Sequence, residues 1–183
     1  MKVGLTGKKG SGKSTAAKYL AHQGYARVNF KDALVSEMKQ NFPGTLEKII
    51  ELMDASAYDG LKPWTVDRLL EEKPPLFRSL MQDYGTQVRR GDDEDYWVVK
   101  WLKNAKHHSL LVVDDVRFIN EADAVRGLNG IIVRIVREGQ VSNDTHMSET
   151  QMDMLEPDYT ITVPDGRLDL MYAELDKITK SPK

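Results

Sequence analysis

The chain has 183 residues, of which 40% are hydrophobic and 30% charged, which suits one domain with a sizeable core. Its 26 basic and 28 acidic residues give a net charge of −2, so no general basic field supports binding of a polymeric nucleic acid. The lack of cysteine excludes disulfides and thiolate metal sites. No apolar run approaches the roughly 20 residues of a membrane span, and no export signal is visible. We therefore expect a cytoplasmic protein with no membrane partner.

Short apolar segments alternate along the chain with segments of helical periodicity. Strands are predicted at 2–6, 26–30, 110–114, 131–136 and 159–163. Helices are predicted at about 14–22, 32–41, 75–90, 93–105, 118–126 and 166–180. The third and fourth strands are nearly continuous aliphatic runs, which is typical of a parallel sheet covered on both faces. The alternation predicts a doubly wound α/β fold: a five-stranded parallel sheet with right-handed crossovers.

Two intervals interrupt this alternation. Residues 31–109 contain several helical patterns but no convincing strand, which is too long for a simple crossover and predicts a helical insertion. Residues 137–158 are rich in polar and turn-forming residues, and we interpret them as a small lid. The prediction is thus a single domain over 1–183 that carries an insertion at about 31–109 and a lid at about 137–158.

Residues 7–14, GKKGSGKS, match the phosphate-binding pattern GxxxxGK[ST] between a predicted strand and a predicted helix. Such a loop turns successive backbone N–H groups toward phosphate oxygens, and the helix N-terminus adds partial positive charge. The predicted nucleotide-binding residues are Gly10, Ser11, Gly12, Lys13, Ser14 and Thr15. Lys13 is expected to reach the β- and γ-phosphates, and Ser14 to bind Mg²⁺. Lys8 and Lys9 are interpreted at least as readily as solvent-facing charges as they are as phosphate contacts.

Two carboxylates follow the third predicted strand at its C-terminal end, where parallel sheets place their ligands. One of Asp114 and Asp115 is expected to hold Mg²⁺, and a turn that caps the next helix is the alternative. Arg117 comes two residues later and is placed to grip a substrate phosphate. Arg137 follows the fourth strand and is our candidate for a lid cation over the transferred phosphate. His146, in the predicted lid, is either a ligand contact or a surface histidine.

Residues 74–91 predict a helix that carries two lines of side chains. Its buried face is expected to contain Phe77, Met81, Tyr84 and Val88. A polar stripe at the same spacing contains Arg78, Gln82, Gly85 and Arg89. A glycine inside a helix costs about 1 kcal/mol relative to alanine, so it needs a reason, such as close approach of a ligand or a backbone. The stripe fits a monophosphate and a base edge, or equally a solvated helix face with a packing glycine.

Several segments together resemble the deoxynucleoside monophosphate kinases of bacteriophages, a branch of the P-loop kinases. In the family's order, and over most of the chain, they are GKKGSGKST (7–15), FKDAL (30–34), RSLMQDYGTQVRR (78–90), DYW (95–97), DVRFINEADAV (115–125) and HMSE (146–149). The phosphate loop alone is widespread, whereas the pairing of R-x-x-x-Q-x-x-G-T-x-x-R with D-V-R-F-x-N-E-A is far more specific. Ile119, where such proteins often carry proline, and the basic pair Lys8–Lys9 are departures that leave the substrate set open.

The resemblance implies a three-layer P-loop kinase that transfers the γ-phosphoryl group of ATP to a deoxynucleoside 5′-monophosphate, with Mg²⁺ as cofactor. The catalytic residues that we expect are Lys13, Asp115, Arg117 and Arg137, with Asp115 and Ser14 on the metal. The implied substrate-binding residues are Asp32, Arg78, Gln82, Gly85, Arg89, Trp97, Arg117, His146 and Glu149. The alternatives are another small-molecule P-loop kinase, of the phosphomevalonate or dephospho-coenzyme A type, and a nucleotide-dependent switch. The oligomeric state is open, with a homodimer as one alternative.

Overall fold

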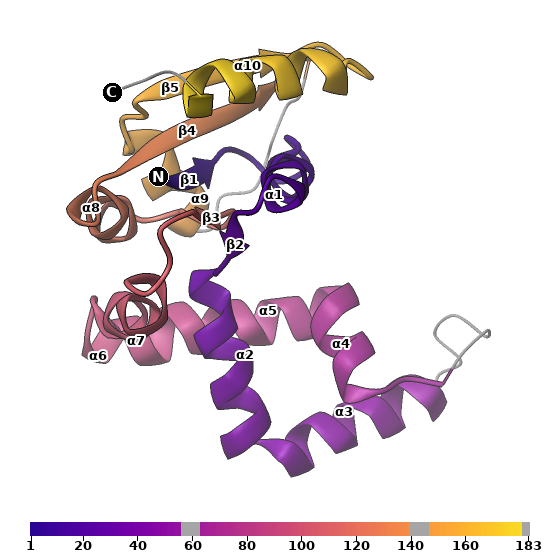
Figure 1. Cartoon of the computed structure of the whole chain (residues 1–183). Helices are drawn as coiled ribbons and strands as arrows, with labels where there is room; N and C mark the ends of the chain where they lie inside the picture. The colour runs from indigo at the N-terminus through magenta and orange to yellow at the C-terminus, as the bar shows by residue number, and fades with distance from the viewer. Residues whose placement is uncertain (56–62, 140–146, 181–183) are drawn as a thin grey trace. The chain divides into compact units, whose positions relative to one another are not determined.

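The computed structural model describes residues 1–55, 63–139 and 147–180. The chain divides into a sheet unit, Met1–Phe30 with Val98–Lys183, and a helical unit, Lys31–Trp97. The elements of both are labelled in Figure 1. The helical unit ends at Trp97, whereas the insertion is predicted to end near residue 109. Within the described ranges, no helix has both the length and the apolar character needed to cross a membrane.

The sheet unit is built on the predicted five-stranded parallel sheet. Its strands are β1 (Lys2–Thr6), β2 (Ala26–Arg27), β3 (Leu111–Val113), β4 (Gly130–Arg137) and β5 (Tyr159–Val163). They are ordered β2-β3-β1-β4-β5, and every neighbouring pair is parallel. The central strand β1 pairs with β3 and β4, so that Val3 lies beside both Val112 and Ile131. The phosphate loop after β1 therefore starts at the middle of the sheet.

Helices cover both faces of this sheet, as predicted. They are α1 (Lys13–His22), α7 (Tyr96–Ala105), α8 (Ile119–Gly127) and α10 (Leu168–Lys180), and the shorter α9 (Met147–Met154) contacts α8. One face packs against α1 and α10 (Figure 1), through Leu20 and Met171 among others. The other packs against α7 and α8, and includes Trp101. Neighbouring residues of β3 alternate between the two cores, with Val112 in the first and Val113 in the second.

Helix α1, which follows the phosphate loop, is tied to α10 by a polar cluster. Tyr19 Oη and Gln23 Nε2 each donate to Asp176 Oδ1 at 2.9 Å. Lys180 Nζ donates to Asp176 Oδ2 at 2.8 Å. The hydrogen bond from Lys180, followed by that from Gln23, lowers the pKa of Asp176 to about 2. The carboxylate is therefore charged at neutral pH and connects the two helices on this face of the sheet.

The helical unit corresponds to the interval without predicted strands. Its elements are α2 (Phe30–Asn41), α3 (Pro43–Ala55), α4 (Val66–Glu72), α5 (Pro75–Asp83), the π-helix η1 (Tyr84–Arg89) and α6 (Arg90–Asp92). Phe30 itself belongs to the sheet unit. The helical unit has a core of its own, in which the buried residues are Met38, Leu46, Trp64, Leu69, Leu70, Phe77 and Met81.

The helix predicted at 75–90 is interrupted by η1. A π-helix forms i→i+5 hydrogen bonds, so each of its residues turns through a smaller angle than in an α-helix. Residues after Tyr84 therefore leave the face predicted from α-helical spacing. Phe77 and Met81 are buried and Tyr84 packs against the same core, as predicted. Val88, however, is 48% exposed, so its predicted burial is wrong.

Candidate active site

The phosphate loop joins β1 to α1 in a shape that glycine permits. Gly7, Gly10 and Gly12 have φ angles of 137°, 82° and 104°, which L side chains rarely adopt. At Gly7 there is also no space for a side chain. A Cβ there would lie 2.2 Å from the carbonyl oxygen of Ile135 and 2.9 Å from Ser11 Oγ. The loop thus lies directly against β4, and its first glycine is required by both conformation and packing.

Several polar groups of the loop fit a bound phosphate chain. Thr6 Oγ1 and Ser11 Oγ are buried and have no hydrogen-bond partner within the described residues. A buried hydroxyl without a partner costs about 1–3 kcal/mol, so a phosphate oxygen beside it would be stabilising. Gly12 provides no side-chain cap for α1, which leaves N–H groups of its first turn for an anion. Lys13 Nζ donates to two carbonyl oxygens of the loop, at 2.5 and 2.8 Å, so its charge is held at the loop.

The loop also contacts α9, whose C-terminal end is bound by a strand arginine. Lys8 Nζ donates to Asp153 Oδ2 at 2.6 Å. Arg134 Nη2 donates to the carbonyl oxygens of Leu155 and, at 3.0 Å, of Met152. A cation is favourable at a helix C-terminus, because the last carbonyls carry partial negative charge. Its hydrogen bonds to the C-terminal end of α9 thus explain why an arginine occurs in the aliphatic strand β4.

Asp114 and Asp115 follow β3 in different surroundings. The side chain of Asp114 is 1% exposed and pairs with Arg27 Nη2 at 2.6 Å. Asp115 is half-buried, and its Oδ1 accepts a hydrogen bond from the backbone N–H of Phe30 at 3.0 Å. A metal that binds together with nucleotide phosphates needs an oxygen that solvent can reach. Asp115 meets this condition better than Asp114.

The donor set at this end of the sheet unit suits Mg²⁺. Ser14, exposed in the first turn of α1, offers a hydroxyl oxygen, and Asp115 offers carboxylate oxygens. Both are hard ligands of the kind that Mg²⁺ prefers. In the part of the chain that the structure describes, no three acidic or histidine side chains gather into a metal cage. Mg²⁺ does not need one, since it usually keeps waters and binds one or two carboxylates with the phosphates.

The two arginines predicted to act on phosphate in the sheet unit differ in their surroundings. The backbone N–H groups of Arg117 and Phe118 donate to Glu121 Oε2 at 2.8 and 3.2 Å, which caps the start of α8. The half-buried Arg117 is thereby held just after β3. Arg137, the last residue of β4, forms an exposed ion pair with Asp165. Exposed pairs contribute about 0–1 kcal/mol to stability, so a phosphate ligand could replace Asp165 as the partner of Arg137 at little cost.

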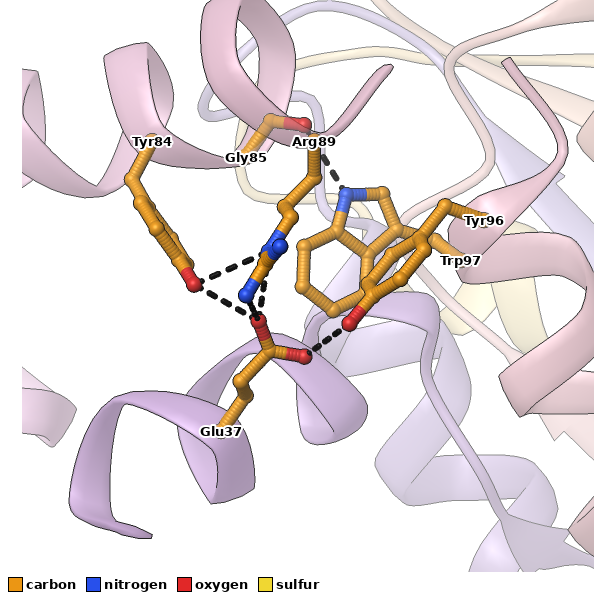
Figure 2. Close-up of polar contacts among 6 residues, drawn as sticks. All are labelled: Glu37, Tyr84, Gly85, Arg89, Tyr96 and Trp97. Carbon is orange, nitrogen blue, oxygen red and sulfur yellow. Dashed lines mark hydrogen bonds and ion pairs between the residues drawn. The ribbon is translucent and has the colours of Figure 1, made fainter. Parts of the chain in front are cut away.

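In the helical unit, Arg89 binds a buried carboxylate that the sequence analysis missed (Figure 2). Glu37 of α2 is only 5% exposed. Its Oε1 accepts hydrogen bonds from Arg89 Nε at 2.7 Å and Tyr84 Oη at 2.6 Å. Arg89 Nη2 lies 2.6 Å from the same oxygen. Glu37 Oε2 accepts a hydrogen bond from Tyr96 Oη at 2.5 Å. These four residues are called the Glu37 cluster below.

The Glu37 cluster stabilises the expected protonation states of its members. Burial, followed by the hydrogen bond to Glu37, raises the pKa of Tyr84, so its hydroxyl stays a donor at neutral pH. Burial lowers the pKa of Arg89, but the hydrogen bonds to Glu37 and Tyr84 outweigh it and raise the pKa overall. Arg89 is therefore a cation throughout the working pH range.

The polar stripe does not share one environment. Arg78 and Gln82 are half-buried on α5 and keep their α-helical spacing. Gly85 is buried, and its carbonyl oxygen accepts a hydrogen bond from the indole of Trp97 at 2.9 Å. A Cβ at Gly85 would lie 3.3 Å from Leu34 Cδ2. Packing against Leu34 and Trp97 thus accounts for this glycine, while the indole is 4% exposed.

For three further residues predicted to bind substrate, the structure gives only their positions. Asp32 is exposed on α2. Glu149 lies on α9, and His146 lies outside the described residues.

The sequence did contain a signal for Glu37, because Leu34 and Met38 place it on the apolar face of its helix. An acidic residue on such a face needs buried partners.

Comparison with known proteins gives a family match over residues 67–175, to the model described as deoxynucleotide monophosphate kinase. A relative from Acanthamoeba polyphaga mimivirus is 29% identical in an alignment of 182 positions that covers 94% of this chain and 93% of that protein. The deoxynucleotide monophosphate kinase of Enterobacteria phage T4 is 32% identical in an alignment of 109 positions that covers 56% of this chain and 45% of that protein. The chain thus spans less than half of the phage T4 protein.

A solved structure supports the fold. The crystal structure of TT1252 from Thermus thermophilus matches with a TM-score of 0.50 and 15% identity, over 100% of this chain and 98% of that one. The family match begins at residue 67, well after the phosphate loop. The loop and the family match are therefore separate signals on one chain.

Proposed function

The chain belongs to the deoxynucleotide monophosphate kinase family, which makes it a nucleoside monophosphate kinase, and from this premise we propose its reaction and its site. The reaction is in-line transfer of the γ-phosphoryl group of ATP to a deoxynucleoside 5′-monophosphate, without a covalent enzyme intermediate. The observation that carries the proposal is a glycine-dependent phosphate loop on a chain whose residues 67–175 match this family.

In this proposal the sheet unit holds ATP. Gly10 to Thr15 direct backbone N–H groups at the phosphates, and Lys13 adds a charge that is already held at the loop. Ser14 and Asp115 hold Mg²⁺, which when bound neutralises charge on the phosphates. Arg117 and Arg137 stabilise the negative charge that develops on the transferred group. No general base is needed, because the acceptor phosphate oxygen is already anionic at neutral pH.

The helical unit holds the acceptor in this proposal. Arg78, Gln82 and Arg89 bind the monophosphate, as guanidinium groups bind phosphate with two parallel N–H bonds. Asp32 is a further substrate residue proposed in this unit, and Gly85 and Trp97 contribute to the site through their packing against each other. His146 and Glu149 are the substrate residues proposed in the lid. Residues 31–109 then act as the acceptor-binding insertion and 137–158 as the lid. The cytoplasmic location and a homodimer stay predictions.

A coupled assay tests this function. ATP and Mg²⁺ are supplied with dAMP, dGMP, dCMP, dTMP or their ribose counterparts, and diphosphate formation is measured. We expect turnover with at least one deoxynucleotide. Turnover with dephospho-coenzyme A or phosphomevalonate and with none of the nucleotides would favour the alternative kinases. ATP hydrolysis that no monophosphate changes would favour a switch.

A further inference from the structure

The Glu37 cluster places a carboxylate in the interior of the helical unit, which is energetically unfavourable. Removing a carboxylate from water costs several kcal/mol, and only well-placed donors offset that cost. Glu37 has such donors in Tyr84, Arg89 and Tyr96, which come from two further segments of the unit. Apolar side chains of similar volume would often stabilise a core at least as well. A purely structural role therefore gives little reason for a buried charge here.

The geometry of Arg89 supplies a reason. A guanidinium has five N–H donors in a plane, arranged along two edges that each match a carboxylate or a phosphate. Glu37 occupies the edge formed by Nε and Nη2 of Arg89. In the part of the chain that the structure describes, no hydrogen-bond acceptor occupies the other edge, formed by Nη1 and Nη2. The Arg89 side chain is 31% exposed, so an anion from solvent can reach it.

Two aromatic rings restrict the guanidinium further. Its Cζ atom lies 5.3 Å from the ring centre of Tyr84 and 5.2 Å from that of Tyr96. Figure 2 shows Arg89 between these two side chains, with its guanidinium bound to Glu37. The Tyr84 and Tyr96 hydroxyls bind Glu37 as well, so each tyrosine limits both ions of the pair. Little conformational entropy is then lost when Arg89 binds a ligand.

We infer that Glu37 is a positioning residue, which fixes Arg89 so that its Nη1/Nη2 edge receives the phosphate of the acceptor monophosphate. This inference rests on the proposed function, since it concerns the same acceptor site. A lysine at this position could supply the charge but not two parallel N–H bonds. The site is thereby selective for a ligand with two adjacent anionic oxygens, which a monoester phosphate offers.

If Glu37 served only to neutralise Arg89, its substitution would change the affinity for the acceptor in the opposite direction. If Glu37 only neutralised Arg89, its charge would repel the acceptor phosphate, and Glu37→Gln would tighten acceptor binding. If Glu37 positions Arg89, the same variant loosens the arginine and weakens acceptor binding. A role in stability alone changes the melting temperature and leaves the KM values of the folded enzyme unchanged.

The test measures kcat and both KM values for wild type and Glu37→Gln with the monophosphate that wild type uses best. A hydrogen bond between charged groups contributes about 1.5–3 kcal/mol, so the KM for the monophosphate should rise at least about tenfold. The KM for ATP should stay within about twofold, because its proposed residues are elsewhere. The matched control is Glu72→Gln, which removes a carboxylate from another arginine pair of the helical unit, with Arg68. It should leave both KM values unchanged.

A rescue experiment adds a readout that a structural role would not produce. Arg89→Ala leaves Glu37 and the two tyrosines around an empty guanidinium position. Ethylguanidinium, added well below denaturing concentration, should restore several-fold activity to Arg89→Ala and none to the double variant Arg89→Ala/Glu37→Gln. If Glu37→Gln does not fold, Tyr84→Phe removes one hydrogen bond from the carboxylate. It should raise the KM for the monophosphate about twofold to threefold.

The possible failures are distinguishable. A wild-type enzyme that phosphorylates no monophosphate refutes the proposed function, and this inference with it. A wild-type enzyme that is active, with a folded Glu37→Gln variant whose monophosphate KM is unchanged or lower, refutes the positioning role alone. Equal rescue of the single and double variants would also refute it.

Discussion

Gly7→Ala tests whether the phosphate loop lies against β4 as the structure shows. The new Cβ would lie 2.2 Å from the Ile135 carbonyl oxygen, and ordinary contacts begin near 3.5 Å. The loop must therefore shift by about 1 Å to accept the methyl group. The residue must also keep or abandon a φ angle of 137°, which costs about 1–3 kcal/mol for a residue with a side chain.

Overpacking adds about 1–3 kcal/mol to this strain, so we expect Gly7→Ala to lose about 4 kcal/mol of stability. The shift also moves the backbone N–H groups away from the phosphates. Losing even one such charge-assisted hydrogen bond should raise the KM for ATP at least about tenfold. Urea denaturation followed by circular dichroism measures the first effect, and the coupled assay measures the second.

Gly24→Ala is the matched control. Gly24 has a φ angle of 92°, and a Cβ there would meet no atom within 4 Å, so only the conformational strain of about 1–2 kcal/mol applies. Its KM for ATP should match wild type. If Gly7→Ala is no less stable than Gly24→Ala and binds ATP as well as wild type does, the described position of the loop is incorrect.

Three further predictions follow from single side chains. Lys13→Ala should lower turnover by about three orders of magnitude while the circular dichroism spectrum stays that of wild type. Asp176 has a pKa of about 2, below its usual 3.8, so its contribution to stability is present above about pH 4 and lost as the pH falls toward 2. The difference in urea midpoint between wild type and Asp176→Asn should shrink over that window, and a difference that persists at pH 2 would contradict the assignment. Phe77→Ala should cost about 3–5 kcal/mol, whereas Val88→Ala should cost less than about 0.5 kcal/mol, and equal losses would contradict the break in spacing at η1.

The features that could be predicted from the sequence are those set by neighbouring residues. The phosphate loop is contiguous and lies between a strand and a helix, so its pattern and its context are both visible in one segment. The aliphatic runs of β3 and β4 likewise contain their own signal, because each is buried on both faces. β2 is shorter than predicted, since only Ala26 and Arg27 pair with β3.

The Glu37 cluster could not be found in this way, because it is assembled from distant segments. Tyr84, Arg89 and Tyr96 stand 47, 52 and 59 residues from Glu37 in the sequence. Each looks like an ordinary helix residue by itself. Only the position of Glu37 between Leu34 and Met38 indicated that its charge is buried.

The break in helical spacing and the buried ion pair have a common explanation. In a continuous α-helix, Arg89 would follow Arg78 and Gln82 on one line of the surface. The π-helix turns the chain less per residue, so Arg89 is rotated relative to that line, and its guanidinium is bound to Glu37. A π-helix and a buried charge each cost stability, and departures of this kind are frequent at functional sites. Both the π-helix and the buried charge lower stability, and both determine the orientation of the Arg89 guanidinium. The simplest explanation is that this orientation is needed for function.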